Sequence, residues 1–271
     1  MSKVNIPHFE LGETLTEEQK AYFDKNGVIL FRNFLPQDVV NLFKSEIKRV
    51  SDELVSQGVD KINGIPLKFG VDVDGSKMVQ RLCFTNHYSE PLKQLLQDPR
   101  LQCLAELLYP YEGRIGENEK DGLVANHYVN SKGSKFTHMG WHTDSPRDLF
   151  LGQKIMPMLN IGIHLDNCAF EDGGLRVIPG THKQGFFKLM FGKKYFIDHN
   201  EDPKEVGFDI ASGDLTVHDG RIWHRAHSSP HEGERSRRRV MYVPLITGKY
   251  KPKDKNSKTP FYHRLAGKIQ N

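Results

Sequence analysis

The chain of 271 residues has few cysteines and no long apolar run. Its three cysteines, Cys83, Cys103 and Cys168, lie far apart, which excludes a disulfide-dense secreted scaffold and the short paired spacings of zinc and redox motifs. No window approaches the roughly 18 consecutive apolar residues of a membrane span. The first ten residues lack the apolar stretch of a signal peptide, and the last four carry no lipidation or peroxisomal signal. We therefore expect a cytoplasmic protein with no membrane partner.

The chain also has little excess charge. Its 38 basic and 34 acidic side chains leave a net charge of +4 with histidine uncharged. Nucleic-acid binding proteins usually concentrate far more positive charge on one face, so this balance disfavours a nucleic-acid partner. Basic residues gather at 235–239 and at 249–258, and the second group lies in a Pro-, Lys- and Asn-rich stretch typical of a solvated tail.

Helix signals dominate the first part of the chain. Thr16 and Gln19 have the spacing of a capping box, and Gly27 can end the helix that they begin. Apolar residues recur at intervals of three and four between Pro36 and Gly58, which predicts an amphipathic helix. Other local signals predict a strand at 27–34 and shorter helices at 91–98 and 99–109.

From about residue 122 the pattern changes to short apolar runs separated by turn residues, which is typical of antiparallel strands. Between Gln184 and Ala211 aromatic and charged residues interrupt this rhythm, as in a loop over a cavity, although a surface excursion gives the same pattern. We predict strands within 122–129, 158–166, 173–180, 213–220 and 238–246. We expect a single domain over 1–271, with a helical part at 14–110, a β-sandwich or barrel at 122–247 and a basic tail at 248–271.

Two of the 13 histidines begin a His-x-Asp sequence. Residues i and i+2 of a strand point to one face, so such a pair can offer an imidazole and a carboxylate to one metal ion. A third ligand from a distant strand would complete the two-His-one-carboxylate set that binds Fe(II). The pairs are His142/Asp144 and His164/Asp166, and the pattern alone does not choose between them.

The order of several segments resembles that of the phytanoyl-CoA dioxygenase family of Fe(II)/2-oxoglutarate-dependent oxygenases. These segments are LTEEQKAYFDKNGVILFRNFL at 15–35, WHTD at 141–144, FEDGGLRVIPGTHK at 170–183, GDLTVHDGRIWHRA at 213–226 and RRRVMYV at 237–243. The resemblance covers about 14–247 and implies a mainly β, cupin-like double-stranded β-helix, or jelly roll, with N-terminal helices packed outside. It also implies Fe(II) as the cofactor, with 2-oxoglutarate and O2 as cosubstrates.

The resemblance carries the metal ligands onto His142, Asp144 and a distal histidine. We assign the distal histidine to His224, because it stands eleven residues after Gly213 of the Gly-Asp motif, as in the family. Its nearby competitors are His218, His227 and His231. The second His-x-Asp pair falls on a strand where the family has no ligands.

The remote carboxylate of 2-oxoglutarate needs a cation, and an arginine can bind it with two hydrogen bonds. The family's arginine stands shortly before a small residue; if that residue is Val240, Arg238 faces inward. Arg237 and Arg239 would then face outward, and they are the alternatives, because an error of one position inverts the faces of a strand. Ala226 stands where the family often has a serine that contacts the cosubstrate, so other residues must complete the pocket. The candidates are Tyr128, Asn126 and Asn160.

These features predict an enzyme that hydroxylates a small-molecule metabolite and releases succinate and CO2. Halogenases of the superfamily replace the carboxylate ligand with Ala or Gly, so Asp144 favours hydroxylation or a related two-electron oxidation. A polar or anionic substrate is expected, with Arg147 and Arg81 as candidate contacts, although an arginine in such a position is more often the partner in a surface ion pair. Two alternatives stay open: a non-catalytic or other-metal cupin-like binding protein, and an enzyme of oxidative nucleic-acid repair.

Overall fold

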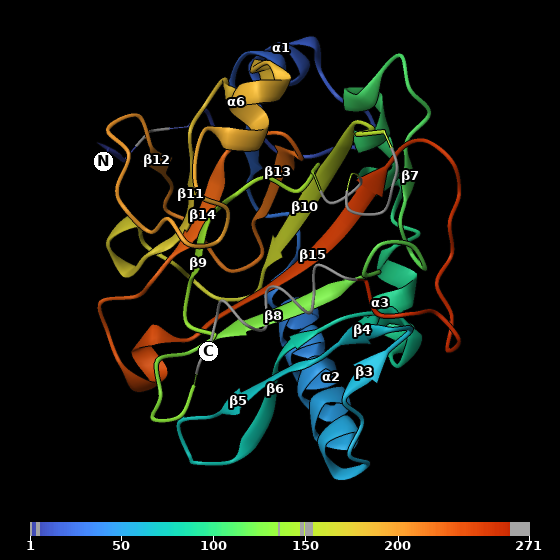
Figure 1. Ribbon diagram of the computed structural model, residues 1–271, viewed down its shortest axis with the longest axis vertical. Coiled ribbons are helices and arrows are strands. Elements are labelled where there is room, and N and C mark those ends of the chain that lie inside the picture. The colour runs from blue at the N-terminus through green and yellow to red at the C-terminus, as the bar shows by residue number, and fades with distance from the viewer. Residues whose placement is uncertain (1, 4–5, 135, 147–148, 150–153, 261–271) are drawn as a thin grey trace.

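A computed structural model describes residues 2–3, 6–134, 136–146, 149 and 154–260 (Figure 1). In this part of the chain two β-sheets enclose a cavity, and helices cover the larger sheet. The larger sheet has the order β2 (Val28–Phe31), β13 (Leu215–Asp219), β10 (Met158–His164), β15 (Arg238–Ile246), β8 (Val124–Tyr128), β6 (Lys77–Leu82) and β5 (Lys68–Val71), with β7 (Arg114–Ile115) beside β15.

The smaller sheet has the order β1 (Ser2–Lys3), β12 (Val206–Gly207), β11 (Gly174–Val177), β14 (His224–His227) and β9 (Met139–His142). Its β1 and β12 are parallel, whereas the other strand pairs of both sheets are antiparallel. A separate hairpin joins β3 (Lys61–Ile62) and β4 (Ile65–Pro66). The mainly β, jelly-roll fold expected from the sequence is confirmed.

The structure describes the α-helices α1 (Glu17–Asn26), α2 (Gln37–Ser56), α3 (Glu90–Leu95), α4 (Pro99–Cys103) and α6 (Phe186–Phe191). The predicted helix at 36–58 is confirmed as α2, with Pro36 at its N-cap. The predicted helix at 99–109 divides into α4 and a 3-10 helix, Leu104–Leu108. Within the described residues, no helix is long and apolar enough to span a membrane.

Alternation along the central strand β10 gives the larger sheet two different faces. Leu159, Ile161 and Ile163 are fully buried in the hydrophobic core that includes the apolar face of α2. Asn160 and His164, at the alternate positions, line the cavity between the sheets. The same strand therefore stabilises the fold on one side and supplies polar groups to the cavity on the other.

The range 14–110, expected to be helical, also contains strands of the larger sheet. Strands β5 and β6 form a hairpin, and β6 pairs with β8 through Arg81–Asn126 and Leu82–Ala125. Gly75, with φ +86°, lies in the turn of this hairpin, and the Asp-Gly sequence there is a known hairpin signal. The strands were missed because their own residues alternate only weakly.

The ends of α1 lie where the sequence predicts them. The Thr16 hydroxyl accepts a 3.2 Å hydrogen bond from the backbone N–H of Gln19, whose side chain accepts a 2.9 Å bond from the backbone N–H of Thr16. Gly27 ends the helix with φ +74°, and a Cβ atom there would lie 2.3 Å from Nδ1 of His182. Both capping predictions are confirmed, and a side chain at position 27 would be strained and would clash.

Substitution of Thr16 by alanine is expected to lower the free energy of unfolding by about 1 kcal/mol, because the cap of the Gln19 N–H is lost. The Thr16→Ser variant keeps the hydroxyl and should differ from the wild type by only a few tenths of a kcal/mol. Urea unfolding of the three proteins measures this difference. Equal stabilities of the alanine and serine variants would show that the cap contributes nothing.

Candidate functional site

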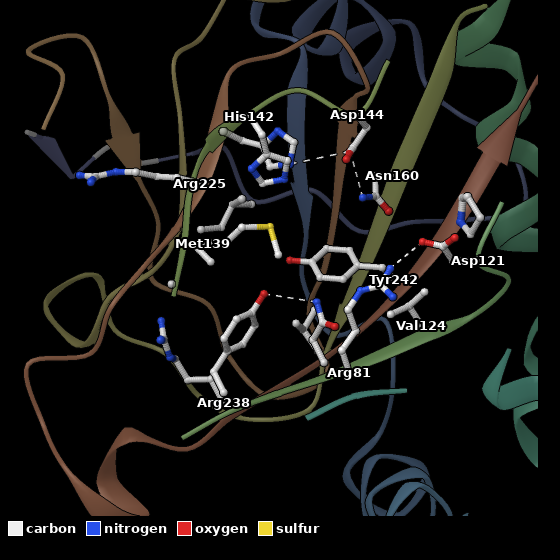
Figure 2. Close-up of a pocket in the computed structure, with 18 of the residues that line it drawn as sticks. Arg81, Asp121, Val124, Met139, His142, Asp144, Asn160, Arg225, Arg238 and Tyr242 are labelled. Carbon is white, nitrogen blue, oxygen red and sulfur yellow. Dashed lines mark hydrogen bonds and ion pairs between the residues drawn. The ribbon is translucent and has the colours of Figure 1, made fainter. Parts of the chain in front are cut away.

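The cavity between the sheets has a volume of about 620 Å3. Strands β8, β10 and β15 of the larger sheet line one side, and β9 and β14 line the other (Figure 2). Its charged and polar side chains come from segments that are far apart in the chain, which only the sheet pairing brings together.

Three candidate metal ligands meet in this cavity. His142 ends β9, His224 begins β14, and the two residues are partners in the antiparallel pairing of these strands. Asp144 follows β9, and its backbone N–H donates to the carbonyl of Gly220 at 2.8 Å. One ligand atom from each of the three residues lies within 4.8 Å of the others.

The backbone fixes the orientation of both imidazoles. Nδ1 of His142 lies 2.8 Å from the carbonyl oxygen of Gly140, and Nδ1 of His224 lies 3.1 Å from that of Ile222. A carbonyl oxygen accepts only, so each Nδ1 carries the proton and each Nε2 keeps its lone pair. Metal-binding histidines commonly have this arrangement, in which the other ring nitrogen donates to a carbonyl.

Burial sets the charge of the cluster. It lowers the pKa of His142 and holds the pKa of His224 well below its usual value, where the neighbouring imidazoles add to the effect. Burial raises the pKa of Asp144, but the surrounding imidazoles, with His224 foremost, outweigh it and hold that pKa well below its usual range. The cluster therefore offers two neutral imidazoles and one carboxylate, which is the protonation state that binds a divalent cation.

The second His-x-Asp pair does not converge on one point. His164 shares a 3.0 Å hydrogen bond with the hydroxyl of Thr216. Asp166 accepts from Arg239 at 2.7 Å and pairs with Lys44 at 3.0 Å. His164 and Asp166 are therefore engaged with different partners, although both line the cavity.

His164 is expected to make the stability of the metal-free protein depend on pH. Burial lowers its pKa to about 4, so the unfolded chain, with a histidine pKa near 6.5, binds the proton first as the pH falls. Stability should therefore decrease between pH 7 and pH 5, with about 2 kcal/mol of this loss due to His164. Chemical unfolding at several pH values should show a shallower loss for His164→Gln, and an unchanged pH dependence would contradict this assignment.

The three arginines at 237–239 have different environments. Arg237 pairs with Asp72 and Glu234, each at 2.6 Å, and lies outside the cavity lining. Arg238 is 8% exposed and lines the cavity. Its guanidinium donates to the carbonyls of His227 at 2.8 Å and Thr137 at 3.2 Å, while its buried Nε has no hydrogen-bond partner within the described part of the chain. Arg238 and Arg239 both line the cavity, but the Arg239 guanidinium donates to Asp166 at 2.7 Å, whereas Arg237 stays outside the lining.

The other candidate contacts lie around the same space. Asn126 donates to the hydroxyl of Tyr128 at 3.3 Å, and its buried Oδ1 has no partner in the described residues. Asn160 donates to Asp144 at 3.1 Å rather than facing the Arg238 end. Figure 2 shows Arg238 at the opposite end of the drawn side chains from Asp144 and Asn160.

Of the two arginines expected to contact the substrate, the structure describes only Arg81. Arg81 lines the cavity and donates to Asp121 at 2.6 Å. Arg147 lies outside the described residues. Tyr242 also lines the cavity but is not among the residues predicted from the sequence. Its side chain lies beside the Arg81–Asp121 pair (Figure 2). Strand alternation could have indicated it, because Tyr242 stands four positions after Arg238 in the same strand.

The irregular segment between Gln184 and Ala211 contributes to the cavity wall. Met190, Tyr195 and Phe196 line the cavity, whereas Phe187 and Phe191 are largely exposed. The hydroxyl groups of Tyr195 and Thr143 are 2.7 Å apart, and the ring of Phe196 stacks on His142 with centroids 4.8 Å apart. Part of this segment thus covers the candidate metal ligands, and part of it is a surface excursion.

The sequence of the chain is similar to that of known proteins. The family model described as phytanoyl-CoA dioxygenase matches residues 23–238. The phytanoyl-CoA dioxygenase domain-containing protein 1 homolog of Dictyostelium discoideum is 24% identical, over 82% of this chain and 88% of that protein.

Solved structures share the fold at low sequence identity. HygX from Streptomyces hygroscopicus, solved with nickel and 2-oxoglutarate, is 17% identical with a TM-score of 0.62, and the match covers 88% of this chain and 89% of HygX. The epimerase SnoN from nogalamycin biosynthesis, solved with Fe3+, alpha ketoglutarate and nogalamycin RO, is 16% identical with a TM-score of 0.61, covering 85% and 83% of the two chains. The carbocyclase SnoK of the same biosynthesis is 14% identical with a TM-score of 0.62, covering 94% and 91%.

Proposed function

Because the chain belongs to the phytanoyl-CoA dioxygenase family, we propose that it is an Fe(II)- and 2-oxoglutarate-dependent dioxygenase that hydroxylates a small metabolite. Enzymes of this family use Fe(II), 2-oxoglutarate and O2. The observation that carries the proposal is the convergence of His142, Asp144 and His224, whose ligand atoms lie within 4.8 Å of one another. Two imidazoles and one carboxylate are the donor set of Fe(II) oxygenases, and they leave positions open for the cosubstrates.

We assign the three side chains to Fe(II). The carbonyls of Gly140 and Ile222 hold the Nδ1 atoms of the histidines, so each Nε2 lone pair would be available to the metal. Bound Fe(II), with 2-oxoglutarate and O2, supplies the oxidation that releases succinate and CO2 and adds one oxygen atom to the substrate. The two imidazoles are neutral and the carboxyl group is ionised, so none of the three ligands has to be deprotonated when the metal binds.

We assign the remote carboxylate of 2-oxoglutarate to Arg238. Its guanidinium is buried, so solvent screens its attraction for an anion only weakly. Its Nε has no hydrogen-bond partner among the described residues and can donate to an incoming carboxylate. The Tyr128 ring lies 5.5 Å from the guanidinium and holds it in place, and Tyr128 in turn accepts from Asn126. Tyr128 and Asn126 would contact the cosubstrate in place of the family's serine, where this chain has Ala226.

We propose a polar or anionic substrate that binds beside Tyr242. Lys68 and Arg81 line the cavity, and Arg81 donates to the carboxylate of Asp121 at 2.6 Å. Burial, with the nearby Arg81, lowers the pKa of Lys68 to about 8, so its ammonium ion gains from a negatively charged neighbour. An anionic substrate would therefore be attracted to this wall while Tyr195 and Phe196 limit access of water from the other side.

The test is succinate production from 2-oxoglutarate under air, with Fe(II) and a panel of small carboxylates and phosphate esters matched with neutral analogues. The proposal expects an anionic compound to stimulate succinate release and to gain one oxygen atom, as shown by mass spectrometry. The His142→Ala variant serves as the control for adventitious iron chemistry. A product that is an isomer of the substrate would indicate epimerisation instead of hydroxylation. A product that lacks two hydrogens would indicate ring closure. Turnover that is unchanged in His142→Ala would contradict the metal assignment.

A further inference from the structure

A fourth histidine lies beside the three candidate metal ligands. His218, in β13, is completely buried, and its Nε2 lies 3.5 Å from Oδ2 of Asp144, the outer limit of a hydrogen bond. Its ring centroid is 4.4 Å from that of His224. Neither ring nitrogen has a hydrogen-bond partner within the described ranges. A buried N–H without a partner costs about 1–3 kcal/mol, so this imidazole needs an acceptor.

Sheet pairing explains how His218 reaches Asp144. Asn160 of β10 and His218 of β13 are direct partners across the antiparallel pair, so their side chains share the cavity face. The Asn160 amide donates to the same Oδ2 at 3.1 Å, and Figure 2 shows Asn160 turned toward Asp144. Two nitrogen groups from adjacent strands therefore surround one carboxylate oxygen.

Asp144 needs such support because it lies outside the strands. It follows β9, and β9 itself pairs with β14 of the smaller sheet. Its side chain, however, extends to β10 and β13 of the larger sheet, across the cavity. Rotation of the carboxylate away from the two histidine ligands would therefore be limited chiefly by Asn160 and His218.

From this geometry we infer that His218 is a positioning residue, which donates from Nε2–H to Asp144 and, with Asn160, holds the carboxylate toward the metal. The inference rests on the proposed function, since it assumes that Asp144 binds the metal. His218 is not itself in the ligand set, because it does not belong to the group whose ligand atoms lie within 4.8 Å of one another. Groups that orient a metal ligand typically change metal affinity 10–100-fold when they are removed.

The inference is tested by binding of Co(II), measured by calorimetry and by the visible spectrum of the bound ion. His218→Leu removes the donor, whereas His218→Gln keeps an N–H that can reach the carboxylate. We expect His218→Leu to bind Co(II) about 10–100-fold more weakly than the wild type and to show an altered spectrum, with His218→Gln retaining most of the affinity. Asn160→Ala, on the partner strand, should weaken binding in the same direction.

His164→Leu is the matched control, because His164 is buried in the same cavity but bonds to Thr216 instead of Asp144. Its Co(II) affinity and spectrum should equal those of the wild type. Wild-type Co(II) affinity in His218→Leu would overturn the inference, whatever the result for Asn160→Ala. Equal losses in His218→Leu and His164→Leu would also overturn it, since they would show a general packing effect. Failure of the wild type to bind Co(II) would instead overturn the proposed function, and the inference with it.

Discussion

Asp144→Ala is expected to weaken Fe(II) binding by more than about 100-fold, because it removes the only carboxylate of the proposed ligand set. Two imidazoles alone neutralise none of the charge of the metal. The fold should persist, because Asp144 lies outside the strands and its backbone N–H still donates to Gly220. Anaerobic calorimetry measures the Fe(II) affinity, and 2-oxoglutarate turnover should fall in parallel.

Asp166→Ala is the control, since Asp166 is the carboxylate of the other His-x-Asp pair. It loses ion pairs with Lys44 and Arg239 and should reduce stability. Its Fe(II) affinity should nevertheless match that of the wild type. Loss of iron in Asp166→Ala, with retention in Asp144→Ala, would mean that the wrong pair has been assigned.

Arg238→Leu is expected to weaken 2-oxoglutarate binding by about 100-fold or more. A charge-assisted hydrogen bond contributes roughly 1.5–3 kcal/mol, and an arginine can make two of them to one carboxylate. Leucine fills part of the space but offers neither charge nor donor. The Kd of 2-oxoglutarate, measured without oxygen in the Fe(II)-loaded protein, provides the comparison, and Fe(II) affinity itself should stay within about threefold.

Arg237→Leu is the neighbouring control. It breaks the ion pairs with Asp72 and Glu234, so the free energy of unfolding should decrease. Its side chain lies outside the cavity lining, so the Kd of 2-oxoglutarate should not change. If Arg237→Leu weakened 2-oxoglutarate binding and Arg238→Leu did not, the anion would bind on the other face of β15, and the assignment to Arg238 would be wrong.

Local signals in the sequence were sufficient for several parts of the fold. The capping box at Thr16 and the glycine at 27 marked both ends of α1, because each depends on a few adjacent residues. Apolar alternation placed the central strands of the larger sheet. The weakly alternating hairpin of β5 and β6 was not found, because its position depends on pairing with β8, which is distant in sequence.

Only some residues of the candidate site could be predicted from the sequence. His142, Asp144 and His224 came from the family resemblance, and the structure brings their ligand atoms together. The relation between Asn160 and His218 could not be predicted, because it is a register contact between strands separated by more than fifty residues. Such contacts follow from tertiary pairing and leave no local pattern in either segment.

The central claim is that the cavity binds Fe(II) and 2-oxoglutarate together. The most direct measurement is the visible spectrum after anaerobic addition of Fe(II) and 2-oxoglutarate to the metal-free protein, compared with Fe(II) alone and with Asp144→Ala. We expect a weak charge-transfer band of the chelated keto acid in the wild type only, and only when Fe(II) and 2-oxoglutarate are both present. Absence of this band in the wild type, or its persistence in Asp144→Ala, would contradict the account.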